Sequence, residues 1–118
     1  MSRTPIVHHI AAIAGAAACA LLVSGQALAV DAAAAQTLAR QNNCFKCHAI
    51  DKKKDGPAWK DVAAKYKNDK DAEAKLVKHL TTGPKVKFED GHTEDHPIVK
   101  AKSPDDTKNL ADWILTLQ

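Results

Sequence analysis

Two cysteines and a histidine stand together as Cys44-x-x-Cys47-His48. This spacing is typical of covalent haem attachment, in which both thiols add to haem vinyl groups and the adjacent histidine ligates the iron. The sequence therefore predicts one haem c, with Cys44 and Cys47 as thioethers and His48 as the proximal iron ligand. Because Met1 is the only methionine, the sulfur ligand that often completes such an iron is missing.

Three other chemistries fit part of this motif. A redox dithiol needs a thioredoxin-like strand and helix setting, and the surrounding sequence offers no β-branched strands. A zinc site could add His92-x-x-x-His96 to the cysteines, but compact fingers separate their ligand pairs by only roughly 12–15 residues, and His48 would have no role. A disulfide between Cys44 and Cys47 is the last alternative. Haem accounts for all the motif residues and is the leading hypothesis.

The N-terminus has the organisation of an export signal. Arg3 precedes an apolar run over residues 10–23, and Ala27-Leu28-Ala29 has the small-x-small pattern that signal peptidase cleaves. The run is shorter than the roughly 18 residues of a membrane span, so a retained anchor is the less favoured alternative. We therefore expect a signal peptide over residues 1–29, cleavage after Ala29, and a periplasmic monohaem domain over residues 30–118 with no membrane span.

The charge balance limits the class of partner. The chain has a formal net charge of +3, and removal of Arg3 with the signal peptide leaves +2. A nucleic-acid-binding domain would need a concentrated basic face, which this sequence lacks. A domain of this length is also marginal for a purely apolar core, and a buried macrocycle would supply additional apolar contact. We therefore expect redox proteins as partners, and no nucleic acid.

The residue pattern predicts helices and no strand. The first three helices are expected over residues 32–42, 59–66 and 71–82. A last helix is expected to begin at Ser103, a favourable N-cap, with Pro104 at the first helical position. Trp113 lies on the apolar face of that helix and is predicted to pack in the core. Residues 84–102 are predicted to form a long irregular connection, of a kind that often carries function.

Three blocks of sequence together resemble the short bacterial class I cytochromes c. They read CFKCHAID at 44–51, GPAWKDVAAKY at 56–66 and LADWIL at 110–115. The resemblance covers residues 36–118 and implies an all-α class I cytochrome c fold of about four short helices around one covalently bound haem c. It also implies that the Pro57 carbonyl orients the His48 ring and that Trp59 belongs to the haem environment.

The chain departs from this family pattern in the loop before the last helix. Relatives of this type present a Met-Pro dipeptide there, whereas this chain has His96-Pro97. His96 is therefore the predicted distal ligand of the iron. His92, four residues upstream, is the alternative, and an open or weakly ligated iron is another. His79 lies on a predicted helix and is expected to face solvent or the core.

These residues predict a periplasmic one-electron carrier with bis-histidine ligation, not an enzyme. Iron with nitrogen ligands on both faces changes its bonds little between oxidation states, which suits electron transfer. The alternatives are a ligand-binding or sensor haem protein with an open distal site, and the cytochrome subunit of a periplasmic dehydrogenase. Lys52, Lys53 and Lys54 either steer an acidic redox partner toward the haem or form a solvated loop.

Overall fold

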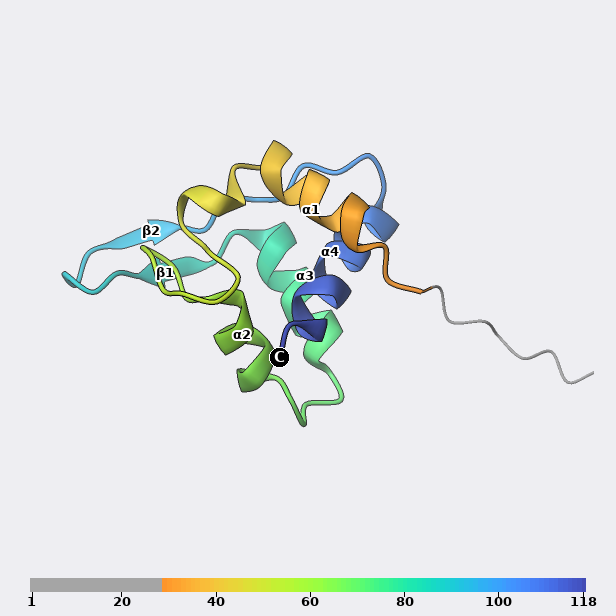
Figure 1. Cartoon of the computed structure of the whole chain (residues 1–118). Helices are drawn as coiled ribbons and strands as arrows, with labels where there is room; N and C mark the ends of the chain where they lie inside the picture. The colour runs from red at the N-terminus through yellow and green to blue at the C-terminus, as the bar shows by residue number, and fades with distance from the viewer. Residues whose placement is uncertain (1–28) are drawn as a thin grey trace, which may run out of the picture.

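A computed structural model describes residues 29–118 of the chain (Figure 1). The predicted signal peptide, residues 1–29, lies outside this part except for its last residue. The elements in chain order are α1 (Ala32–Gln41), the 3₁₀ turn η1 (Cys44–Lys46), α2 (Trp59–Lys65), α3 (Ala72–Thr82), β1 (Lys85–Lys87), β2 (Thr93–Asp95) and α4 (Pro104–Thr116). The helices lie where the sequence predicts them, which confirms the all-α class. In the described part, no helix has the length and apolar character to cross a membrane.

The core is built around the crossing of α1 and α4, the first and last helices (Figure 1). Ala39 and Ala111 are both 0% exposed, and their small side chains allow the two helices to approach closely. The N-cap of α1 is tied to α4, since the Asp31 N–H donates to Asn109 Oδ1 at 2.8 Å and Asn109 Nδ2 donates to the Asp31 carbonyl at 2.9 Å. Trp113 is buried in this core, as predicted.

The start of α4 is fixed by its first residues. The Asp106 N–H donates to Ser103 Oγ at 3.3 Å, and the Ser103 N–H donates to Asp106 Oδ2 at 3.1 Å. This reciprocal capping box, with Pro104 in the first turn, confirms the predicted helix start. One result of this placement is that Leu110 and Ile114 of α4 form a wall of a cavity of about 620 Å³.

The prediction that residues 84–102 are irregular was wrong, because part of this segment forms an antiparallel hairpin that projects from the helices (Figure 1). Its residue pairs are Lys85 with Asp95, Val86 with Glu94, and Lys87 with Thr93. Each strand has three residues and Val86 is the only apolar one among them, so no alternating pattern was long enough to recognise. The usable signal was Asp90-Gly91, a common hairpin-turn dipeptide. Gly91 has φ +91°, which glycine adopts readily.

Candidate haem site

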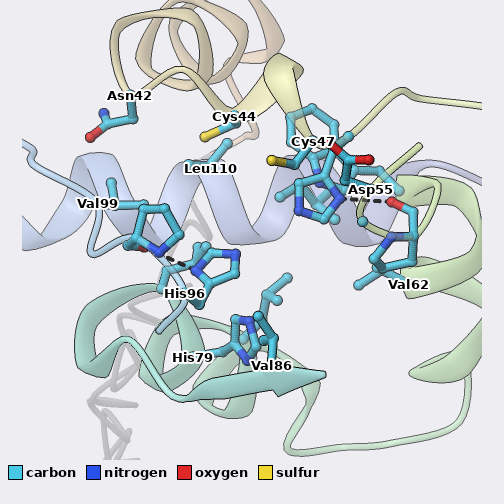
Figure 2. A pocket seen from close by; sticks show the side chains of 18 of the residues that line it. Asn42, Cys44, Cys47, Asp55, Val62, His79, Val86, His96, Val99 and Leu110 are labelled. Carbon is cyan, nitrogen blue, oxygen red and sulfur yellow. Dashed lines mark hydrogen bonds between the residues drawn. The ribbon is translucent and has the colours of Figure 1, made fainter. Parts of the chain in front are cut away.

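A cavity of about 620 Å³ opens beside α4 and is lined by residues of α2, α3 and α4 and of the loops between the elements (Figure 2). Val62 of α2, Leu80 of α3 and Leu110 of α4 contribute apolar side chains, and most of the lining is apolar. Ligand cavities commonly have volumes of about 300–1,000 Å³. Cys47 and His48 of the sequence motif also line it. The size, apolar lining and position of the cavity therefore fit a macrocycle attached at the motif.

The motif cysteines lie at one side of this cavity (Figure 2). The chain enters η1 through Asn43 in the left-handed conformation, and the N–H groups of Cys47 and His48 both donate to the Cys44 carbonyl, at 3.2 and 3.0 Å. Both thiols are free, so the disulfide alternative is not formed. Burial raises the pKa of the Cys44 thiol. The local turn thus presents two thiols to one cavity, as thioether formation with one haem requires.

The His48 ring is held by the loop that precedes α2. Its Nδ1 lies 2.7 Å from the Pro57 carbonyl oxygen, which is the contact that the family resemblance implied. When Nδ1 donates this hydrogen bond, the lone pair of Nε2 remains available to bind a metal. Trp59 stacks on the ring with centroids 5.6 Å apart. A Cβ at Gly56 would lie 2.6 Å from His48 Cε1, so this close packing requires glycine. Burial lowers the pKa of His48, which favours the neutral ring.

His96 faces His48 across the cavity. The ring centroids are 6.2 Å apart and the rings are inclined by 47°. His96 Nδ1 lies 2.9 Å from the Pro97 carbonyl oxygen, so with Nδ1 as donor its Nε2 is also free. Two metal–nitrogen bonds of about 2 Å each, plus the distance from each nitrogen to its ring centre, separate two axial imidazoles by about 6 Å. The two histidines therefore have the spacing needed to hold one metal ion between them.

His92 lies outside the cavity, on the hairpin. Its ring stacks on Phe88 with centroids 4.3 Å apart, its Nδ1 contacts the Asp90 carboxylate, and its Nε2 lies 3.2 Å from Glu94 Oε1. The contact with Asp90, followed by that with Glu94, raises the pKa of His92. Among residues 29–118, no three His, Cys, Asp or Glu side chains converge to hold a metal ion by themselves. The geometry needed for the zinc alternative is therefore not formed.

His79 is the site residue that sequence reasoning misplaced. Its side chain lines the cavity, and its ring meets the His96 ring edge-on, with centroids 4.5 Å apart and an interplanar angle of 63°. Burial lowers the pKa of His79. Helical spacing offered a signal, because His79 follows Leu76 by three residues and shares its face of the helix. Leu76 also lines the cavity.

The three lysines after the motif are not equally available to a partner. Lys53 forms an ion pair with Glu89 at the tip of the hairpin, and Lys54 Nζ donates to the Phe45 carbonyl at 2.6 Å. Two of the three cations are thus engaged within the molecule. The loop that carries Lys52 is therefore less basic toward a partner than its sequence indicates.

Known proteins share this fold and motif. The cytochrome c family model matches residues 32–118. Cytochrome c-552 of Nitrosomonas europaea is 45% identical over 102 residues, which cover 86% of this chain and 91% of that protein. Cytochrome c-551 of Pseudomonas aeruginosa is 39% identical over 98 residues, covering 81% and 90% respectively. The crystal structure of the class 1 cytochrome MtoD from Sideroxydans lithotrophicus ES-1 matches with a TM-score of 0.73 and 60% identity, over 75% of this chain and 98% of that one.

These similarities confirm the predicted cofactor and the class I resemblance. The cytochromes c of this type carry a single haem c, attached covalently through the C-x-x-C-H motif. They are electron-transfer proteins and not enzymes. The match covers nearly all of the described residues. The chain therefore belongs to the cytochrome c family, as a short bacterial class I, monohaem electron carrier.

Proposed function

We propose that this chain is a periplasmic one-electron carrier whose haem iron is ligated by His48 and His96, with thioethers at Cys44 and Cys47. The observation that supports this ligation best is the pair of imidazoles that face each other across the cavity, 6.2 Å apart. The bound haem supplies the one-electron redox chemistry. The side chains of this protein hold the haem, set its axial ligands and exclude water from it.

The hydrogen-bond geometry of the two rings supports their role as ligands. In each, Nδ1 faces a backbone carbonyl, that of Pro57 for His48 and that of Pro97 for His96. A hydrogen bond of this kind fixes the tautomer, orients the ring and raises the basicity of the other nitrogen. Both Nε2 atoms are therefore suited to bind iron, and two nitrogen ligands favour a low-spin centre that reorganises little on electron transfer.

His96 is favoured over the two distal alternatives. The carboxylates of Asp90 and Glu94 engage both ring nitrogens of His92, which would have to be released before that residue could bind iron. An open iron would need the His96 ring to lie away from His48. Its place inside the cavity argues against a ligand-binding or sensor haem protein. A cytochrome subunit of a dehydrogenase would use the same site, so the proposal of electron transfer applies to it too.

Absorption spectra of the purified protein test the distal ligand. The wild type is expected to be six-coordinate and low-spin in both oxidation states. His96→Ala should convert most of the iron to high spin and allow ferrous iron to bind carbon monoxide. His92→Ala is the matched control, four residues away, and should retain the wild-type spectrum. If the effects of the two substitutions are exchanged, His92 is the ligand. If the wild-type iron is already high-spin and neither substitution changes the spectrum, the distal site is open.

The periplasmic location rests on the sequence of residues 1–29, of which the structure describes only Ala29. Cleavage after Ala29 would leave Val30 as the first residue of the exported chain. We expect the haem-containing protein in the periplasmic fraction, with an N-terminal sequence beginning at Val30. Recovery of the intact N-terminus in the membrane fraction would show that the segment is retained as an anchor.

We also propose that the loop carrying Lys52, Lys53 and Lys54 steers acidic redox partners toward the haem. The loop directly follows the haem-binding motif in the chain, and complementary charge accelerates encounter over distances up to about a Debye length. Because Lys53 and Lys54 are engaged within the molecule, Lys52 is expected to contribute most of this effect.

A further inference from the structure

The end of α3 contacts the segment that carries His96 through two backbone hydrogen bonds. The Val99 N–H donates to the Leu80 carbonyl at 2.8 Å, and the His96 N–H donates to the Pro84 carbonyl at 2.9 Å. The donors of these bonds are His96 itself and the residue three positions after it. They satisfy a carbonyl in the last turn of the helix and one just beyond it, and they fix the path of the distal segment against α3.

Gly83 provides a third contact between the same segments. It ends α3 with φ +57°, a conformation that glycine adopts without steric cost. A Cβ at this position would lie 2.7 Å from the His96 carbonyl oxygen and 3.0 Å from Ile98 Cγ1. Any larger residue would therefore have to push the distal segment away from α3.

The hairpin cannot provide this support by itself. All three residues of β2 are exposed, and β1 has only Val86 partly buried. In contrast, Leu76 and Leu80 of α3 are both 6% exposed and pack in the core. The rigid connection from the core to His96 therefore runs through α3.

His79 of α3 contacts the His96 ring directly. Its side chain extends from α3 toward His96 (Figure 2), and the two rings meet edge to face with centroids 4.5 Å apart. Aromatic rings prefer this arrangement, which contributes beyond the area it buries.

We infer that the C-terminal end of α3, residues 79–84, is a distal platform that keeps His96 on the haem iron, with His79 and Gly83 as positioning residues. This inference rests on the proposed ligation by His96. Neither residue binds the iron in this arrangement. Both act by restricting the positions that the His96 ring can occupy.

Cyanide binding to the ferric holoprotein tests the role of His79, because cyanide must displace the distal ligand. We expect His79→Ala to raise the apparent affinity for cyanide roughly two- to tenfold, the range expected from loss of one aromatic contact. His79→Phe preserves an edge-to-face ring without a nitrogen and should restore the wild-type affinity. An unchanged affinity in His79→Ala, or failure of His79→Phe to restore it, would overturn the assignment.

A pair of glycine substitutions tests the platform separately. Gly83→Ala and Gly91→Ala both place a side chain at positive φ, but a Cβ at Gly91 has no neighbour within 4 Å. Gly83→Ala should raise cyanide affinity at least tenfold, and Gly91→Ala should leave it unchanged. Equal effects would mean that backbone strain alone acts, and the platform would be rejected. If Gly83→Ala does not fold, the two His79 variants decide the question.

His96→Ala separates this inference from the proposed ligation. If its spectrum equals that of the wild type, the ligation itself is wrong. If His96→Ala becomes high-spin while the His79 and Gly83 variants bind cyanide as the wild type does, only the platform is wrong. If His96→Ala stays low-spin and the double variant with His79→Ala becomes high-spin, His79 is an iron ligand and its positioning role is rejected.

Discussion

The proximal and distal sides of the cavity hold their histidines by different means. His48 is fixed by its near neighbours in sequence, since its Nδ1 contacts the Pro57 carbonyl and its ring packs on Gly56. His96 is placed by α3, which ends fourteen residues earlier at Thr82, through the Pro84 carbonyl. The proximal arrangement therefore depends on a local sequence block, and the distal one depends on tertiary packing.

The proximal and distal histidines also differ in how they are connected to the buried core. Trp59 stacks on His48 and meets Trp113 of α4 edge-on, with ring centroids 5.4 Å apart. This row of rings connects the proximal histidine directly to the buried centre of the protein. On the distal side only part of His79 is buried, and the hairpin beside His96 is exposed. We therefore expect the distal ligand to be the more easily exchanged of the two.

The largest expected effect comes from removing the covalent attachment at the motif. Cys44→Ala combined with Cys47→Ala should abolish covalent haem, because no thiol remains in residues 30–118 to form a thioether. Haem staining after denaturing electrophoresis, and extraction with acidified organic solvent, would measure this. Cys19→Ala is the matched control, since Cys19 belongs to the predicted signal peptide, and should retain full staining. Covalent haem in the double variant would contradict the thioether assignment.

Sequence predicted the proximal side better than the distal side for a physical reason. The motif, Pro57 and Trp59 act over short separations, and the start of α4 follows from the local chemistry of Ser103 and its neighbours, so these features can be recognised in a linear pattern. His79 and His96 meet only because the hairpin returns the chain to α3. The lone apolar residue Val86 could not reveal that return by periodicity, although the Asp-Gly turn could have done so.

Exchange of the distal ligand should have the next largest effect. His96→Met replaces an imidazole with a thioether, which stabilises ferrous iron relative to ferric iron. We expect the midpoint potential to rise by roughly 100 mV, a modest part of the about 0.8 V that axial ligands span. Protein-film voltammetry would measure the shift, and the weak far-red band of ferric iron–methionine would report sulfur binding.

The control for this exchange is His92→Met, which places the same thioether on the exposed part of the hairpin. Its potential should stay close to that of the wild type, because that side chain does not line the cavity. If His96→Met binds through sulfur and its potential does not rise, the distal ligand does not set the redox range of this protein. A rise in His92→Met alone would instead place the distal ligand at His92.

The smallest expected effect is on the electron-transfer rate, through the charges of the loop after the motif and of the hairpin. The loop with Lys52, Lys53 and Lys54 follows the proximal motif, whereas the hairpin holds four carboxylates, at Glu89, Asp90, Glu94 and Asp95. If an acidic partner docks on the proximal side, Lys52→Glu should lower the bimolecular electron-transfer rate a few-fold at low ionic strength, and salt should reduce the difference. Stopped-flow measurements over a range of ionic strengths would test this.

Lys87→Glu is the matched control, because it reverses one exposed charge on the hairpin. It should change the rate less than Lys52→Glu does if the loop after the motif, and not the hairpin, is the docking surface. Lys53→Glu is harder to interpret, because it also breaks the ion pair with Glu89, an exposed pair that stabilises the fold by no more than about 1 kcal/mol. A rate that depends on Lys87 and not on Lys52 would place the docking surface on the distal side, and the lysines after the motif would then serve only to keep that loop hydrated.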